Sequence, residues 1–392
     1  MSTIEKNIKE TKLLPLTFLN RSTIVLGGSN SGKTKTTENI LHCLADKLVY
    51  IYVFTDGSGS TNIFNKYTHK SLIKDKLDAK KLQDIWDRQK ALTEVYNNAN
   101  NMDVLKSLYN KVKDDKSEKR IGDILSVKER VRQAVNKDKI LSAQRKKKKL
   151  QPIEDMLNNA VKSMYKKAIN ANKQTIDKSN LDEKQIYALK YINMPEPNMA
   201  IVMDDVSSQL KKMKPKEKTL VYEMFTQCRH HGVTMIFTGH NHTNFDRDAR
   251  SQAFNTVFCG SDSLQSYFEK GVCGIKLKNK DFDYFTEHMR EYPDIKMMFV
   301  REESTFYKVK INFEIKPKLI GNKAVHALCK VIDNPNDFIN KNNTAARKFS
   351  LTSEIARVKG KKSRCSDASQ DVQNYVFSSA KKNAKDKFKP YV

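Results

Sequence analysis

The chain shows two kinds of hydrophobic pattern. Short, continuous apolar runs occur in the first sixty residues and again between residues 199 and 310. Such runs predict buried parallel strands, because a strand that is covered on both faces has no polar side. The predicted strands are 23–26, 48–54, 199–203, 233–238 and 256–259, followed by a hairpin of 296–300 and 305–309. With helices expected at 36–48, 220–230, 263–270 and 281–290, the pattern predicts an α/β fold with a mainly parallel central sheet.

The second pattern fills the space between these two blocks. From residue 66 to about 195 the chain is polar and Lys-rich, and its apolar residues recur at helical spacing, which predicts a long helical insertion. After Lys316 the chain is basic and weakly periodic, and we expect a partly disordered extension there. The expected organisation is therefore a first core part (1–65), the insertion (66–195), a second core part (196–315) and a basic C-terminal extension (316–392).

A glycine-rich loop follows the first predicted strand. Gly27 to Thr34 match G-x-x-x-x-G-K-[ST], the Walker A phosphate loop of P-loop NTPases. The backbone N–H groups of such a loop form a concave anion site, and the N-terminus of the next helix adds a favourable dipole. Lys33 would contact the β- and γ-phosphates of ATP, and the Thr34 hydroxyl would bind Mg²⁺. The expected nucleotide-binding residues are Gly27, Gly28, Ser29, Asn30, Ser31, Gly32, Lys33, Thr34 and Lys35.

Polar residues follow two further predicted strands. The apolar run 199–203 ends in Asp204 and Asp205, as a Walker B strand does. Asp204 would hold Mg²⁺, directly or through water, and Asp205 would polarise the attacking water. The run 233–238 ends at Gly239 and His240, at a carboxyl strand end where open α/β sheets bind ligands. Arg229 and Arg250 are the alternative candidates for an arginine finger that acts on the γ-phosphate of a neighbouring subunit.

Composition restricts the partner and the compartment. The sequence has 72 Lys and Arg against 45 Asp and Glu, a net charge of +27, which favours a polyanionic partner, nucleic acid before an anionic membrane. No apolar run reaches the length of a membrane span, and the first twelve residues lack the apolar core of a signal peptide. The six cysteines form no C-x-x-C pair, which argues against a zinc site and for a reducing compartment.

Together these motifs resemble those of a known family. The Walker A and B segments, the Arg229-His230-His231 run leading into a strand, and the downstream Arg250 with Phe254-Asn255 are similar to those of the genome-packaging ATPases of nucleocytoplasmic large DNA viruses, in the FtsK–HerA superfamily. This resemblance implies a RecA-like P-loop core in a homo-oligomeric, hexameric ring that has ATP sites between its subunits. The ring would move double-stranded DNA into a preformed capsid, so the implied partners are capsid or portal proteins, and the implied location is the viral factory of the host cytoplasm and the virion.

The sequence departs from the family pattern in two respects. The family places a γ-phosphate-sensing glutamine at the end of the fourth strand, where this chain has His240 with Asn241 beside it. The segment between the Walker motifs is also longer than the family leads us to expect. The hypothesis is an ATP-driven DNA translocase. One alternative is a helicase, which would prefer single strands; the other is a nucleotide-gated DNA-binding or assembly scaffold with slow hydrolysis.

Overall fold

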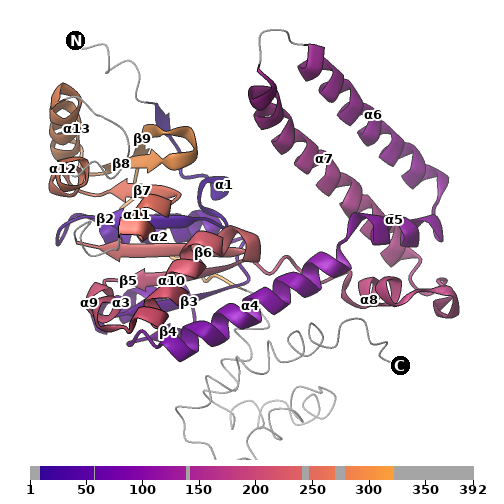
Figure 1. The fold of residues 1–392 in the computed structure, drawn as a ribbon, viewed down its shortest axis with the longest axis horizontal. Coiled ribbons are helices and arrows are strands. Elements are labelled where there is room, and N and C mark those ends of the chain that lie inside the picture. The colour runs from indigo at the N-terminus through magenta and orange to yellow at the C-terminus, as the bar shows by residue number, and fades with distance from the viewer. Residues whose placement is uncertain (1–8, 57, 138–141, 241–246, 270–278, 322–392) are drawn as a thin grey trace, which may run out of the picture. The chain divides into compact units, whose positions relative to one another are not determined.

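The chain forms two compact units in the computed structural model, which describes residues 9–56, 58–137, 142–240, 247–269 and 279–321 (Figure 1). The core unit contains the described residues up to Lys90 and from Glu196 onward, and the helical unit contains the described residues of Ala91–Pro195. The long helix α4 (Ala79–Ala99) begins in the core unit and ends in the helical unit. Both the predicted extension from residue 322 onward and Asn241 lie outside the described residues.

A nine-stranded sheet forms the centre of the core unit, in the order β1-β9-β8-β7-β2-β6-β5-β3-β4 (Figure 1). Only β8 runs antiparallel to its neighbours, so the predicted α/β fold with a mainly parallel sheet is confirmed. Every residue of β2, β3, β5, β6 and β7 is buried, as continuous apolar runs require. The strands are β1 (Glu10–Thr11), β2 (Ser22–Leu26), β3 (Tyr50–Thr55), β4 (Ile73–Lys74), β5 (Met199–Asp204), β6 (Val233–Gly239), β7 (Asn255–Phe258), β8 (Ile295–Val300) and β9 (Thr305–Lys310).

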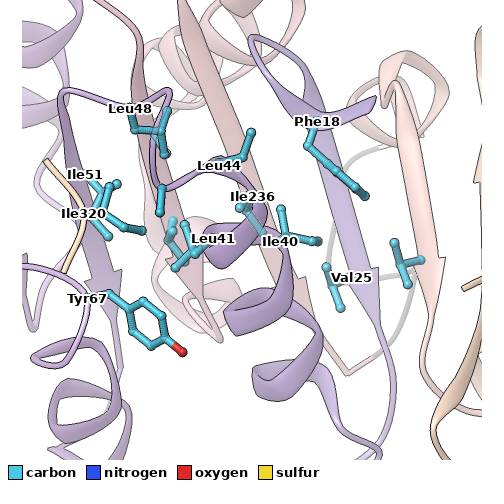
Figure 2. Packing of buried hydrophobic residues seen from close by; sticks show 14 of the residues in the cluster. Phe18, Val25, Ile40, Leu41, Leu44, Leu48, Ile51, Tyr67, Ile236 and Ile320 are labelled. Carbon is cyan, nitrogen blue, oxygen red and sulfur yellow. The ribbon is translucent and has the colours of Figure 1, made fainter. Parts of the chain in front are cut away.

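Helix α2 (Lys33–Leu44) covers the middle of the sheet (Figure 2). Ile40, Leu41 and Leu44 lie on one face, because residues three and four apart share a side of a helix, and all three are fully buried. They belong to one hydrophobic cluster with Val25 and Ile236 of the sheet. The other core helices are α1 (Pro15–Phe18), α3 (Ser58–Phe64), α9 (Ser207–Lys212), α10 (Pro215–Gln227), α11 (Arg247–Gln252), α12 (Ser261–Glu269) and α13 (Asn279–Glu291), with 3₁₀ turns η1 (Lys70–Leu72), η3 (Cys228–His231) and η5 (Arg301–Glu303).

Several element boundaries differ from those that periodicity predicts. Helix α2 begins at Lys33 rather than at residue 36, because Gly32 caps it in the left-handed region at φ 91°. Residues 58–64 form α3, and α9 forms in the Lys-rich connection. Both helices are too short to show an amphipathic pattern in the sequence. Residues 66–90 belong to the core unit rather than to the helical unit, since β4 pairs with β3 and the Tyr67 hydroxyl donates to Glu38 of α2 at 3.0 Å.

The helical unit has a hydrophobic core of its own. Leu105 and Leu108 of α5, Val161 and Ile169 of α7, and Leu189 of α8 are buried together. Its helices after α4 are α5 (Met102–Asn110), α6 (Asp115–Lys137), α7 (Ala143–Ala171) and α8 (Glu183–Tyr191), with the 3₁₀ turn η2 (Lys178–Asn180). The helical character of this segment is therefore as predicted. Within the described ranges, no helix combines the length and apolar character that crossing a bilayer requires.

Candidate nucleotide site

The phosphate loop joins the carboxyl end of β2 to α2. The N–H of Gly27 donates to the carbonyl of Gly239 at 3.1 Å, which ties the start of the loop to the end of β6. A Cβ on Gly27 would collide with the Ser31 side chain and lie 2.9 Å from Cβ of Cys259, so only glycine fits this position. Asn30 and Gly32 adopt positive φ values of 60° and 91°. These residues give the loop the tight reversal that a phosphate cradle needs.

Lys33 occupies the centre of this loop. It is 7% exposed, and its Nζ donates to the carbonyls of Gly27 at 2.9 Å and Gly28 at 3.0 Å. The loop therefore wraps around its own lysine. Phosphate oxygens would be stronger acceptors for this ammonium than neutral carbonyls, because charge-assisted hydrogen bonds are shorter and stronger. The neighbouring Lys35 instead points to Glu38, with an Nζ–Oε2 distance of 2.7 Å.

The two acids of the Walker B segment are held by one threonine of the next strand. The Thr238 hydroxyl of β6 donates to Asp204 Oδ1 at 2.7 Å and accepts from the Asp205 N–H at 3.0 Å. Asp204 is 2% exposed, and this burial raises the pKa of its carboxyl group. Asp205 adopts a positive φ of 53°, which turns the chain sharply after β5. The turn places the two carboxylates differently: Asp204 is buried, whereas about 39% of the Asp205 side chain is exposed.

His240 connects the lysine to the second acid. Its Nδ1 lies 3.4 Å from Nζ of Lys33, and its Nε2 lies 3.6 Å from Oδ1 of Asp205. The structure thus brings together Lys33, His240 and Asp205, which lie far apart in the sequence. About 45% of the His240 side chain is exposed, so a ligand in the loop can reach it.

The residues at this edge fit a nucleotide with Mg²⁺. The loop holds the buried ammonium of Lys33, and Oδ1 of Asp205 is buried without a hydrogen-bond partner among the described residues. Thr34, the second residue of α2, and Asp204 supply oxygen donors, and Mg²⁺ binds in proteins through a few such oxygens together with phosphates. These two residues would hold the ion, with the carboxylate acting directly or through water.

The two arginine-finger candidates lie near the amino ends of parallel strands, opposite the carboxyl ends that hold the phosphate loop. Arg229 is exposed on η3, which precedes β6, whereas His240 follows β6. The seven residues of β6 separate the two ends of this strand by about 20 Å. Arg250 lies on α11 before β7, and its Nε and Nη1 are buried without a hydrogen-bond partner among the described residues. A single chain therefore does not bring either arginine to its own phosphate loop.

Two contacts of the site escaped the sequence reasoning. Thr238 sits inside an apolar strand, and nothing in the strand pattern marks it as the support of both acids. Lys296 of β8 is 4% exposed, and its Nζ donates to the carbonyl of Ser31 in the phosphate loop at 2.9 Å. A signal existed for Lys296, because a lysine interrupts an otherwise apolar run from Ile295 to Val300.

Several known proteins resemble this chain distantly. No protein-family model matches the sequence. The uncharacterized protein B354L of African swine fever virus is 25% identical over 363 residues, covering 88% of this chain and 98% of the viral protein. A solved structure of the genome packaging NTPase B204 of Sulfolobus turreted icosahedral virus 2 aligns with 75% of this chain and 98% of its own, at 13% identity and a TM-score of 0.35. EssC of Geobacillus thermodenitrificans (ATPases 2 and 3) aligns with 82% of this chain and 45% of its own, at 11% identity and a TM-score of 0.35.

These two solved structures are a genome packaging NTPase and a protein with ATPase domains, in keeping with the class that the sequence motifs resemble. At TM-scores of 0.35, the fold assignment rests on features of the chain itself. Those features are the mainly parallel sheet, the glycine-rich loop between β2 and α2, and the acid pair on β5, which is separated from the loop strand by β6 alone. Together they establish the P-loop NTPase fold.

Proposed function

We propose that this chain is an ATP-driven translocase that moves double-stranded DNA into a viral capsid. The observation that carries the proposal is the convergence of Lys33 and Asp205 on His240 at the phosphate loop: Nδ1 of His240 lies 3.4 Å from Nζ of Lys33, and its Nε2 lies 3.6 Å from Oδ1 of Asp205. This is the arrangement that γ-phosphate hydrolysis needs: a cation for the developing charge and a carboxylate for the attacking water.

Each residue of the edge has a distinct task. The loop N–H groups bind the phosphates, and Lys33 neutralises charge as the terminal bond breaks. Asp204 and Thr34 hold Mg²⁺, which supplies Lewis-acid stabilisation of the phosphoryl oxygens when bound. Asp205 orients water and accepts its proton. His240 would detect the terminal phosphate, because its Nδ1 lies 3.4 Å from the Lys33 ammonium that binds that phosphate.

The two arginines near the amino ends of the strands indicate that the active protein is an oligomer. Arg229 cannot serve its own phosphate loop, so it, or Arg250, would complete the site of a neighbouring subunit. A closed ring, hexameric by analogy with the family, provides this arrangement at every site. Such a ring would work at the viral factory and the capsid portal, with ATP and Mg²⁺ as cofactors.

The basic charge supports DNA as the partner. The whole chain carries 72 Lys and Arg against 45 Asp and Glu. A motor that grips the phosphate backbone binds with little regard to sequence and loses affinity steeply as salt rises. The resemblance of the sequence motifs to the packaging ATPases of large DNA viruses, which implies double-stranded DNA, favours duplex over single strands.

The test is steady-state ATP hydrolysis by the full chain, alone, with long duplex DNA and with single-stranded DNA, at two salt concentrations. Strong stimulation by duplex that fades with salt supports the translocase. Stimulation by single strands alone identifies a helicase. The helical unit, with its separate hydrophobic core, favours one further candidate, an assembly scaffold. Nucleotide binding without stimulation by either DNA form identifies the scaffold and overturns the translocase.

A further inference from the structure

Lys296 is a buried cation directly beneath the phosphate loop. It projects from β8, is 4% exposed, and donates from Nζ to the carbonyls of Ser31 at 2.9 Å and Cys259 at 3.1 Å. In the part of the chain that the structure describes, no carboxylate lies within ion-pair distance of it. A buried ammonium is costly unless it is compensated, so these two carbonyl contacts are what stabilises Lys296 inside an apolar strand.

The geometry of the loop shows what Lys296 holds. No peptide bond of the described chain is cis, and in a trans peptide the carbonyl and the following N–H point in opposite directions. Because the Ser31 carbonyl turns toward Lys296, the N–H of Gly32 turns away from it. Gly32 is also in close contact with this lysine: a Cβ built there would lie 3.5 Å from both Cε and Nζ of Lys296.

Two lysines therefore grip the loop at different points. Lys33 binds the carbonyls of Gly27 and Gly28 at its beginning, and Lys296 binds the carbonyl of Ser31 near its end. Lys33 must share its ammonium between these carbonyls and the phosphates once a nucleotide binds. The Lys296 contacts need not change, because they lie on the side of the Ser31–Gly32 peptide opposite the Gly32 N–H.

We propose that Lys296 is a second lysine of the nucleotide site, a positioning residue that fixes the end of the phosphate loop and directs the Gly32 N–H toward the phosphates of a nucleoside di- or triphosphate. The proposal rests on nucleotide binding by the loop, which is part of the proposed function. It adds a role for β8, a strand outside both Walker motifs.

The charge of Lys296 makes nucleotide affinity depend on pH, which is a second way to detect this role. Burial lowers the pKa of Lys296, while the Cys259 thiol and Asp294 oppose that shift. A bound phosphate favours the charged form, so nucleotide binding and protonation of Lys296 support each other. Nucleotide affinity should therefore fall as pH rises through the pKa of Lys296 in the nucleotide-free protein.

The experiment compares the affinity of the full chain for ADP with Mg²⁺, measured by calorimetry, in wild type, Lys296→Met and Lys296→Arg. The control is Lys310→Met on β9, which removes an exposed lysine whose ammonium lies 3.4 Å from Asp294. We expect Lys296→Met to weaken ADP binding roughly ten- to a hundredfold, the usual range for a charged hydrogen bond. Lys296→Arg should recover most of the affinity, and Lys310→Met should not change it.

A second measurement keeps the proposal testable if Lys296→Met fails to fold. Thermal unfolding checks each variant, and the pH dependence of ADP affinity is compared between wild type and Lys296→Arg. Wild type should begin to lose affinity at a lower pH than Lys296→Arg, since arginine stays charged there whereas Lys33 is a lysine in both proteins. Equal profiles, or wild-type ADP affinity in folded Lys296→Met, overturn the inference.

The variant Lys33→Ala separates this failure from a failure of the proposed function. If Lys33→Ala loses nucleotide affinity and folded Lys296→Met does not, only the role of Lys296 is wrong. If the wild type and both variants bind no nucleotide, the assignment of the nucleotide site is wrong, and the inference about Lys296 is wrong with it.

Discussion

The core unit and the helical unit use charge in opposite ways. In the core, several charges that matter are inside: Lys33, Asp204 and Lys296 are each less than 10% exposed, and each has named hydrogen-bond partners. In the helical unit the charges lie mainly on the surface. Residues 91–195 carry 23 Lys and Arg against 13 Asp and Glu, whereas the core ranges 1–90 and 196–321, about twice as long, carry 34 against 26.

This difference in burial indicates that the core unit is suited to catalysis and the helical unit to binding a polyanion through surface charge. A buried charge with fixed partners acts strongly on a ligand, and removing one partner is costly. An exposed charge contributes little by itself and acts through number and density. Single substitutions should therefore disable the core, and only groups of substitutions should weaken the helical unit.

The largest expected effect is that of Lys33→Ala. The change removes the cation at the centre of the loop and the contact to His240. Loss of one preorganised charged donor lowers turnover about a hundredfold or more. Steady-state ATP hydrolysis measures this, with Lys47→Ala, an exposed lysine beyond the far end of α2, as control. Wild-type turnover in Lys33→Ala would show that the loop is not the catalytic site.

The second prediction concerns the two hydrophobic cores. Leu41→Ala in α2 and Leu108→Ala in α5 each remove a fully buried side chain, and each should lower the free energy of unfolding of its own unit by about 2–5 kcal/mol. Only Leu41→Ala should impair nucleotide binding, because α2 carries Lys33 and Thr34.

Chemical unfolding followed together with ADP binding checks this second prediction. If Leu108→Ala abolishes ADP binding at temperatures where the protein is folded, the two units are not energetically separate. If Leu41→Ala leaves the stability unchanged, the packing of α2 on the sheet does not have the importance that its burial implies.

Sequence reasoning captured the core strands because their signal is local. The continuous apolar runs around Ile24, Ile201 and Ile236 are buried on both faces, and the glycines of the loop are fixed by backbone geometry. Asp204 and Asp205 follow such a run directly, so their place at the sheet edge could be predicted as well. The same logic placed His240 at the carboxyl end of a strand, where ligands bind in open α/β sheets.

What the sequence could not show depends on contacts between distant segments. Thr238 supports both acids through one hydroxyl, and no pattern distinguishes it from other strand threonines. The pairing of β4 with β3 joins residues 66–90 to the core, although their spacing is helical or irregular. Lys296 was visible as a polar residue in an apolar run, but its partner, Ser31, lies 265 positions away.

The third prediction tests the surface charge of the helical unit. Lys116, Lys119, Arg130 and Lys137 are exposed residues of α6, and their joint replacement by Gln should weaken duplex DNA binding. Each lost phosphate contact should reduce the salt dependence by about one unit of logarithmic slope. DNA-free ATP hydrolysis should remain at the wild-type rate, because no site residue changes.

A matched set of core lysines serves as the control for this third prediction. Lys211, Lys212, Lys216 and Lys218 are exposed on α9 and α10, and their replacement by Gln removes the same charge. If this set weakens DNA binding and the α6 set does not, the DNA surface belongs to the core unit, and the division of roles between the units is wrong.

The smallest expected effect lies in the stability of the metal-free protein. Burial raises the pKa of Asp204, so the folded state resists ionisation that the unfolded chain undergoes near pH 3.9. Stability from this group is present below that pH and is lost as pH rises through the folded pKa. Asp204→Asn, which keeps an oxygen to accept from Thr238, should therefore stabilise the protein at pH 7 and hardly at pH 4.

The expected gain for Asp204→Asn is roughly 0.5–2 kcal/mol, as for other stabilising substitutions at functional sites. Chemical unfolding in a chelating buffer measures it, with the exposed Asp155→Asn of α7 as control, which should show no pH-dependent gain. The same Asp204→Asn protein should lose Mg²⁺-dependent turnover, because a neutral amide binds Mg²⁺ poorly. A variant that is less stable at pH 7 would show that the Asp204 carboxylate is compensated in the fold. Burying charged groups in the core unit would then not lower its stability. The core and helical units would differ only in where their charges lie.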